Sequence, residues 1–88
     1  MLDGYGDPKP PDEMSRQLLD RHSDDIQKFL GIKYDHADVI HYQTKVVAGI
    51  NFMILAESDT GIRFNVVIYK MMGYTGIYTL VTECTFYR

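Results

Sequence analysis

The spacing of apolar residues changes once along the chain and predicts one helix followed by a sheet. Over residues 12 to about 30, apolar positions recur every three or four residues, which predicts a single long amphipathic helix. From residue 33 onward the chain consists of short runs rich in β-branched and aromatic residues, which are typical of strands. The predicted strands cover residues 33 to about 44, 50–55, 64–71 and 77–87.

The predicted helix has recognisable ends and one apolar side. Pro11, Asp12 and Glu13 suit its start, because proline fits the first turn and carboxylates favour the positive end of the helix dipole. Gly31 is a typical stop signal. The apolar stripe, which we expect to pack on the sheet, comprises Met14, Leu18, His22, Ile26 and Phe29, widened by Leu19 and Leu30.

Short connections between the strands predict an antiparallel meander in a single α+β domain of 88 residues. Reversals are expected at Ala48-Gly49, at residues 58–61 and at residues 72–76. In a meander the first and third reversals lie at the same end of the sheet, so the two hairpin tips should lie side by side there. On the last strand, one face is expected to carry Tyr78, Leu80, Thr82, Cys84 and Phe86.

The first reversal has an unusual composition for a turn. Lys45, Val46 and Val47 stand directly before Ala48-Gly49, although turn tips are normally polar. An apolar tip is unfavourable in water unless a partner covers it, so this hairpin indicates binding.

Residues 1–11 contain few core-forming side chains and include Pro8, Pro10 and Pro11. Proline disfavours helix in the residue before it, so we expect a flexible, extended N-terminal arm. The sequence leaves the path of this arm open.

Charge and cysteine content exclude several classes of function. A net charge of −3 gives no electrostatic basis for nucleic-acid binding, and no basic cluster favours a membrane surface. The chain shows no signal-peptide pattern and no apolar run long enough to cross a bilayer. Cys84 is the single cysteine, which excludes an internal disulfide and favours a cytoplasmic protein.

We expect neither catalysis nor a cofactor or metal. The spacing of His22, His36 and His41 matches no metal-binding pattern, so these histidines are expected to be structural or exposed to solvent. Cys84 shares its predicted strand face with Leu80 and Phe86, which favours burial over nucleophilic catalysis.

Residues 42–52, Tyr-Gln-Thr-Lys-Val-Val-Ala-Gly-Ile-Asn-Phe, resemble the signature hairpin of the cystatins, which inhibit papain-like cysteine proteases. The short chain without disulfides is similar to the stefin (type 1) branch. The resemblance covers nearly the whole chain: Gly4 lies in an arm before one helix, the second hairpin has the spacing of a stefin, and the C-terminal end Thr85-Phe86-Tyr87 is also similar.

The resemblance implies a cystatin-like fold, an antiparallel sheet of four to five strands wrapped around one long helix. It also implies reversible, tight-binding inhibition of proteases such as papain and the cathepsins. The arm and both hairpins would form a wedge that blocks the active-site cleft. Leu2 would enter an apolar pocket, and Gly4, or alternatively Gly6, would turn the arm away from the catalytic cysteine. The hairpin contacts would come from Lys45, Val46, Val47, Ala48 and Gly49 and from Met72, Gly73 and Tyr74.

Two residues depart from the usual pattern. Lys45 replaces a neutral Gln, which adds a desolvation cost if its charge becomes covered. Gly73 stands where a proline is common, in a second hairpin shorter than usual. The alternative interpretation is a non-inhibitory module of the same fold that binds another protein.

The first hairpin also predicts exchange of strands between two copies of the chain. Val46 and Val47 favour extended backbone, so holding them beside a tight reversal is expected to store strain. Opening the hairpin would join the first two strands, and the core contacts would be remade between chains. We therefore expect a monomer that forms a domain-swapped dimer on partial heating, and this dimer should not inhibit because it lacks the first hairpin loop. Size-exclusion chromatography with an inhibition assay on each peak tests this, and a dimer as inhibitory as the monomer would contradict it.

Overall fold

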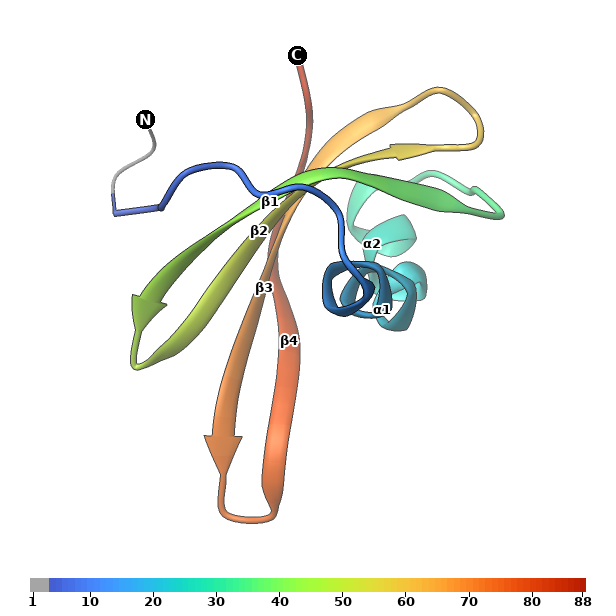
Figure 1. Ribbon diagram of the computed structural model, residues 1–88. Coiled ribbons are helices and arrows are strands. Elements are labelled where there is room, and N and C mark those ends of the chain that lie inside the picture. Colours follow the sequence, from blue (N-terminus) through green and yellow to red (C-terminus); the bar gives the residue numbers. More distant parts are fainter. Residues whose placement is uncertain (1–3) are drawn as a thin grey trace.

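A four-stranded antiparallel sheet with two helices against one of its faces forms the framework of the chain (Figure 1). The structure is a computed structural model that describes residues 4–88. The strands follow one another in the sheet in chain order, so the predicted α+β class and antiparallel meander are confirmed. The elements are α1 (Glu13–Arg21), α2 (Ser23–Leu30), β1 (Ala37–Val47), β2 (Gly49–Ser58), β3 (Arg63–Gly73) and β4 (Gly76–Phe86).

The segment predicted as one helix consists of two helices that meet at His22. Asp12 caps α1: its side chain accepts a hydrogen bond from the Ser15 amide at 2.8 Å, and Ser15 Oγ accepts one from the Asp12 amide at 3.0 Å. α2 ends at Gly31, whose φ of 66° is the left-handed conformation expected of a stop signal. Within residues 4–88, neither helix is long and apolar enough to cross a membrane.

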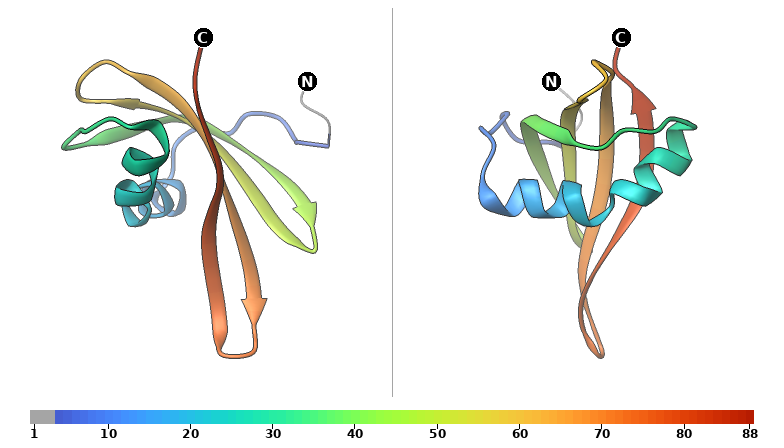
Figure 2. Two further views of the ribbon diagram at one scale, coloured as in Figure 1. Left: turned by 180° about the vertical axis from the view of Figure 1, so that it is seen from behind. Right: turned by 90° about the vertical axis from the view of Figure 1, so that its right-hand side faces the viewer.

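The break at His22 coincides with a contact outside the helices. His22 has φ −102° and ψ 15°, away from helical values, and its Nε2 atom lies 2.7 Å from Thr79 Oγ1 on β4. α1 packs on β1 and α2 packs on β4. The break at His22 thus lies at the point where the helical segment passes from β1 to β4 and bonds to the sheet (Figure 2).

The core lies between the helices and the sheet face that they cover. Phe29 was expected there but is 54% exposed, so this prediction is wrong. Phe29 lies over β4, which is the edge strand of the described sheet, and no further strand extends beyond it to cover the ring. The largest fully buried side chains are those of Phe64, Leu19, Ile26, Ile54, Ile68 and Val66.

The first strand begins later and ends later than predicted. The residues before Ala37 form a connection and not a strand. The Asp59 carboxylate, which follows β2, accepts hydrogen bonds from the Asp35 and His36 amides of this connection at 3.0 and 3.1 Å. At its other end β1 continues through Val47, because Lys45 to Val47 pair with β2. The reversal predicted at Ala48-Gly49 is therefore confined to Ala48.

A β-bulge at Thr82 changes which side chains of β4 face the core. Val67 pairs with Glu83 and Ile68 pairs with Val81, which leaves Thr82 as an extra residue. The alternation of faces therefore shifts at this point: Val81 is buried and Cys84 packs against the core, whereas Leu80 is 54% exposed. The bulge contradicts the prediction of one shared face for Tyr78, Leu80, Thr82, Cys84 and Phe86.

Replacing His22 by Gln should reduce the loss of stability at acidic pH. His22 is 8% exposed, and burial lowers its pKa, with partial compensation by the Asp25 carboxylate. A histidine whose pKa is lower in the folded state contributes stability that is complete above about pH 6.5 and is lost as the pH falls through the folded-state pKa. Between about pH 7.5 and about pH 5, the free energy of urea unfolding should fall more for the wild type than for His22→Gln.

Other titrating groups are common to both proteins and cancel in this comparison. His36 acts in the opposite direction: its hydrogen bond to Asp38 raises its pKa, so its contribution is present at acidic pH and is lost as the pH rises. Hydrogen bonds lower the pKa values of Asp12 and Asp59, which therefore act at more acidic pH. Equal pH dependence of the free energy of unfolding in the two proteins would show that the titration of His22 does not affect stability.

Candidate functional site

Exposed apolar side chains gather where the two hairpins project beyond the helices. Toward the hairpin tips, the last buried row of the sheet beneath the helices is formed by Phe52, Ile68 and Val81. Beyond this row both hairpins continue toward the same end of the sheet, as predicted, but they diverge and their tips do not lie side by side as expected (Figure 1). Such a concentration is typical of a contact surface, because apolar residues on a monomer surface are usually scattered. Among the described residues, this surface contains Val46, Val47, Ile50, Met72, Tyr74, Ile77, Tyr78 and Leu80.

The tip of the first hairpin presents two valines on a very tight reversal. Val46 is 83% exposed and Val47 is 39% exposed, and neighbouring strand residues point to opposite faces. Val47 pairs with Gly49, so Ala48 alone makes the turn. Gly49 has φ 122°, and a Cβ atom there would lie 2.6 Å from the Lys70 carbonyl oxygen. Glycine is therefore required at this position both for the turn and for the close approach of β3.

Tyr69 on β3 links the first hairpin to the second. Its hydroxyl donates a hydrogen bond to the Ala48 carbonyl oxygen, at the point of reversal. The Tyr69 ring also meets the Tyr78 ring in an edge-to-face contact with 6.4 Å between centroids. The Tyr78 hydroxyl in turn donates to Met71 Sδ at 3.1 Å. The tips are thus held by side chains of the second hairpin where no core supports them.

The contacts that Tyr69, Met71 and Tyr78 make between the hairpins were not apparent from the sequence. Tyr69 and Met71 are two residues apart and share one strand face, and Met71 pairs directly with Tyr78. The alternation of side chains between the two faces of β3 was therefore visible in the sequence. The pairing of Met71 with Tyr78 across the strands depends on a register that the sequence did not specify.

The residues predicted at the second hairpin lie at its tip. Met72 is exposed, and Tyr74 stands in the two-residue reversal between β3 and β4. Gly73 lies beside the Tyr78 ring, where a Cβ atom would approach two ring carbons at 3.3 Å. Lys70 is the last β3 residue that pairs with β2, so the second hairpin extends past the first.

The N-terminal arm runs along the free edge of β1. Gly6 donates its amide to the Thr44 carbonyl at 3.0 Å, and its own carbonyl accepts from Gln43 Nε2 at 3.0 Å. Lys9 and Tyr42 exchange two backbone hydrogen bonds of 2.8 and 3.1 Å. The arm is therefore anchored to the first hairpin at Gly6 and at Lys9, which the sequence did not reveal.

Gly4 and Gly6 differ in their need for glycine. Gly4 has φ 78°, and a Cβ atom there would lie 2.7 Å from Lys45 Cε. A Cβ atom on Gly6 would meet only the Thr44 carbonyl oxygen, at an ordinary 3.9 Å. The position that requires glycine in the arm is therefore Gly4. Leu2, the other arm residue expected at the site, lies outside the described residues.

The cysteine and two of the histidines make structural contacts. Burial raises the pKa of the Cys84 thiol to about 11, so the thiol is protonated and weakly nucleophilic at neutral pH. His36 is paired with Asp38 at 2.6 Å, and His22 is bonded to Thr79. No group of metal-binding side chains is found in residues 4–88.

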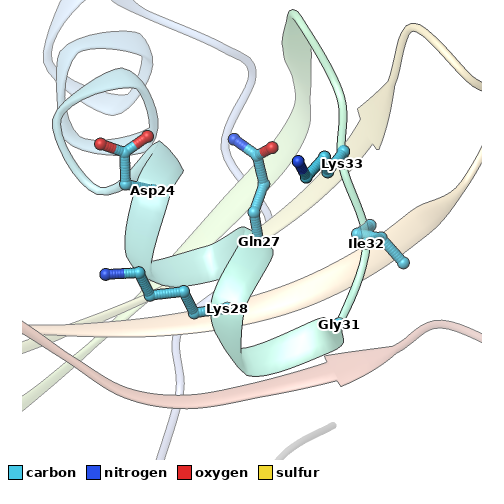
Figure 3. A pocket seen from close by; sticks show the side chains of 6 residues that line it. All are labelled: Asp24, Gln27, Lys28, Gly31, Ile32 and Lys33. Carbon is cyan, nitrogen blue, oxygen red and sulfur yellow. The ribbon is translucent and has the colours of Figure 1, made fainter.

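A separate hollow lies at the end of α2 (Figure 3). Gln27 in this hollow already uses its amide, since Oε1 accepts from the Tyr34 amide at 3.1 Å and Nε2 donates to the Ser23 carbonyl at 3.2 Å. The charged side chains around it are exposed, so they do not form the buried polar group that orients a small ligand. The hollow measures about 420 Å³ and is lined by Asp24, Gln27, Lys28, Gly31, Ile32 and Lys33.

Alanine substitutions at Gly49 and Gly76 provide a matched test of the hairpin geometry. Both glycines have positive φ, 122° and 127°, so each substitution pays a conformational cost of about 1–3 kcal/mol. Nothing lies within 4 Å of a Cβ atom at Gly76, whereas one at Gly49 meets Lys70 backbone. Gly49→Ala should therefore reduce the free energy of unfolding by at least about 1 kcal/mol more than Gly76→Ala, measured by urea denaturation. Equal losses would contradict the close approach of β3 to the first tip.

Comparison with known proteins does not assign the chain to a family. No protein-family model matches it, and no curated protein matches its sequence. The similarity of residues 42–52 to the cystatin hairpin therefore stays a prediction.

Proposed function

We propose that this chain is a reversible, tight-binding inhibitor of papain-like cysteine proteases and that its fold is cystatin-like. In this proposal the sheet wraps around the helical segment, and the arm and two hairpin tips form a wedge that enters the active-site cleft. The observation that carries the proposal is the exposure of Val46 and Val47 beside the Ala48-Gly49 reversal, within the stretch that resembles the cystatin signature.

The tips are suited to tight binding because they are held in place before a partner arrives. The hydrogen bond from Tyr69 to Ala48 and the edge-to-face contact of Tyr69 with Tyr78 restrict the first reversal in the free protein. A surface that is already ordered loses little conformational entropy on docking, so more of its apolar contact contributes to affinity.

The three parts of the wedge would take different places in the cleft. Val46, Val47, Ala48 and Gly49 would lie on the primed side, with Met72, Gly73 and Tyr74 beside them. Leu2 would fill an apolar non-primed pocket. Gly4, with its positive φ, would turn the arm away from the catalytic cysteine, so that no peptide bond is presented for cleavage.

The rival proposal is a non-inhibitory binding module of the same fold. The same apolar surface at the hairpin tips supports it, because any protein partner with an apolar groove would cover these side chains. The two proposals differ in one outcome, the inhibition of a papain-like protease.

We also propose that the protein is a cytoplasmic monomer that undergoes domain swapping under stress. The single cysteine, Cys84, is half-buried and unpaired with any other cysteine, which suits a reducing compartment. Val46 and Val47 lie within β1, so the strain expected in them is absent, and the tight part of the first reversal is the close approach of Lys70 to Gly49.

Purified protein at micromolar concentration should abolish hydrolysis of a peptide substrate by papain, and activity should return on dilution. Trypsin, a serine protease, is the control and should be unaffected, because its cleft and nucleophile differ. Full papain activity at micromolar protein would overturn the inhibitory proposal and leave the rival.

The variant Val46→Asp should lose inhibition by more than tenfold while it folds normally. Val46 is 83% exposed in the free protein, so the charge should change the free energy of unfolding by less than about 0.5 kcal/mol. In the complex the carboxylate would be covered without a partner. Tyr87→Asp is the matched control, because it places the same charge at an exposed apolar residue near the C-terminus, at the opposite end of the sheet (Figure 1). Equal inhibition by both variants would exclude the first tip from the interface.

A further inference from the structure

We propose that Lys45 is a positioning residue that holds Gly4 and Tyr5 of the N-terminal arm against the first hairpin. The contacts between Lys45 and the arm are argued from the structure alone. Their consequence for protease affinity rests on the proposed inhibition. Lys45 is one of the two residues that depart from the cystatin-like pattern, and this role gives the departure a physical meaning.

The contacts of Lys45 lie where the backbone contacts of the arm end. In the described chain, the hydrogen bond of Gly6 to Thr44 is the last backbone bond toward the N-terminus. Beyond it, Gly4 lies against the stem of Lys45, since a Cβ atom on Gly4 would be 2.7 Å from Lys45 Cε and 3.2 Å from Cδ. The next residue, Tyr5, presents its ring to the Lys45 ammonium, with 5.9 Å from Nζ to the ring centroid.

Tyr5 in turn rests on the sheet. It is half-buried, and burial is the main cause of its raised pKa, with a hydrogen bond to Asn51 acting in the opposite direction. Lys45 and Asn51 are paired across β1 and β2, so both contacts of Tyr5 come from one row of the first hairpin. The ring therefore lies over this row of the first hairpin, with the Lys45 ammonium facing it and the Asn51 side chain beside it.

A glutamine at residue 45 would supply only one of these contacts. Its Cδ and terminal amide atoms could lie along Gly4 as Lys45 Cδ and Cε do, but it carries no charge to face the Tyr5 ring. The lysine stem covers the glycine while its ammonium group stays near the ring, which is how long basic side chains usually combine apolar and polar contacts. The charge that was expected to oppose binding thus contributes to the order of the arm.

The first experiment measures the arm in the free protein by NMR. Lys45→Met keeps most of the stem and removes the cation, and Tyr5→Leu removes the ring. Each should raise the amide exchange rate of Gly6 about two- to fivefold, because an exposed cation–π contact contributes about 0.5–1 kcal/mol. The double variant should exchange no faster than either single variant, since both remove the same contact. Lys28→Met, which removes an exposed lysine on α2, is the charge-matched control and should leave Gly6 unchanged.

Unchanged exchange of Gly6 in Lys45→Met, or fully additive effects of the two substitutions, would overturn the positioning role. This measurement requires no protease, so it decides the role of Lys45 even if the proposed inhibition fails.

The second experiment tests whether the ordered arm matters for binding. Lys45→Met should weaken papain inhibition in the full chain about two- to fivefold, as it frees the arm. In a chain truncated before Asp7 the same substitution should have a smaller effect, because no arm remains to be positioned. An equal loss in both backgrounds would mean that Lys45 acts by touching the protease directly, which would overturn the arm-mediated effect on affinity. Absence of inhibition by the wild type would instead overturn the proposed function.

Discussion

The length of the helical segment relative to the strands determines the rest of this structure. The last buried row of the sheet beneath α1 and α2 is formed by Phe52, Ile68 and Val81. His22 still reaches Thr79 in the next row on the same face, and the cover ends there. Strands of ten or eleven residues are longer than this cover requires, so both hairpins continue into solvent. A small core therefore supports a second region that has no core of its own.

That second region is stabilised by individual contacts. Burial of apolar area cannot order the tips, because Val46 and Met72 are largely exposed. The hydroxyl of Tyr69 fixes the first reversal, the thioether of Met71 accepts a hydrogen bond from Tyr78, and Lys45 contacts the arm. Each contact is worth little energy, yet each fixes one segment relative to another. A surface built in this way keeps its apolar side chains exposed and still has a defined shape.

The sequence was informative about elements and poorly informative about the contacts between them. The number and order of the strands and the placement of both tips at one end follow from local composition and short connections, and these predictions are confirmed. The bounds of the first strand were wrong, because it begins at Ala37 and continues to Val47. The bulge at Thr82 was missed because strict alternation has no signal for one extra residue. The break at His22 was missed because it depends on Thr79, more than fifty residues later in the chain.

In the candidate site too, some residues could be found from local composition, whereas others could be found only from their contacts. Val46, Val47 and Gly49 were identified because apolar residues beside a small-residue reversal are unusual. Tyr69 and Tyr5 were not identified, since an aromatic residue on a strand or in an arm is ordinary until its partner is known. The degree of exposure of Val46 depends on the strand register, and the position of Gly4 beside Lys45 depends on the path of the arm. Neither could be predicted from the sequence.

The course of the arm has a further consequence for how the sheet behaves in a crowded solution. An uncovered edge strand is a template on which other chains can add strands and aggregate. On the β1 side of the sheet that template is occupied, because Lys9 pairs with Tyr42. The residues on either side of Lys9 are Pro8 and Pro10, which have no amide hydrogen to offer to an incoming strand. The arm thus occupies the middle of the β1 edge with a segment that offers few amide hydrogens to a further strand, while the hairpin tips stay open.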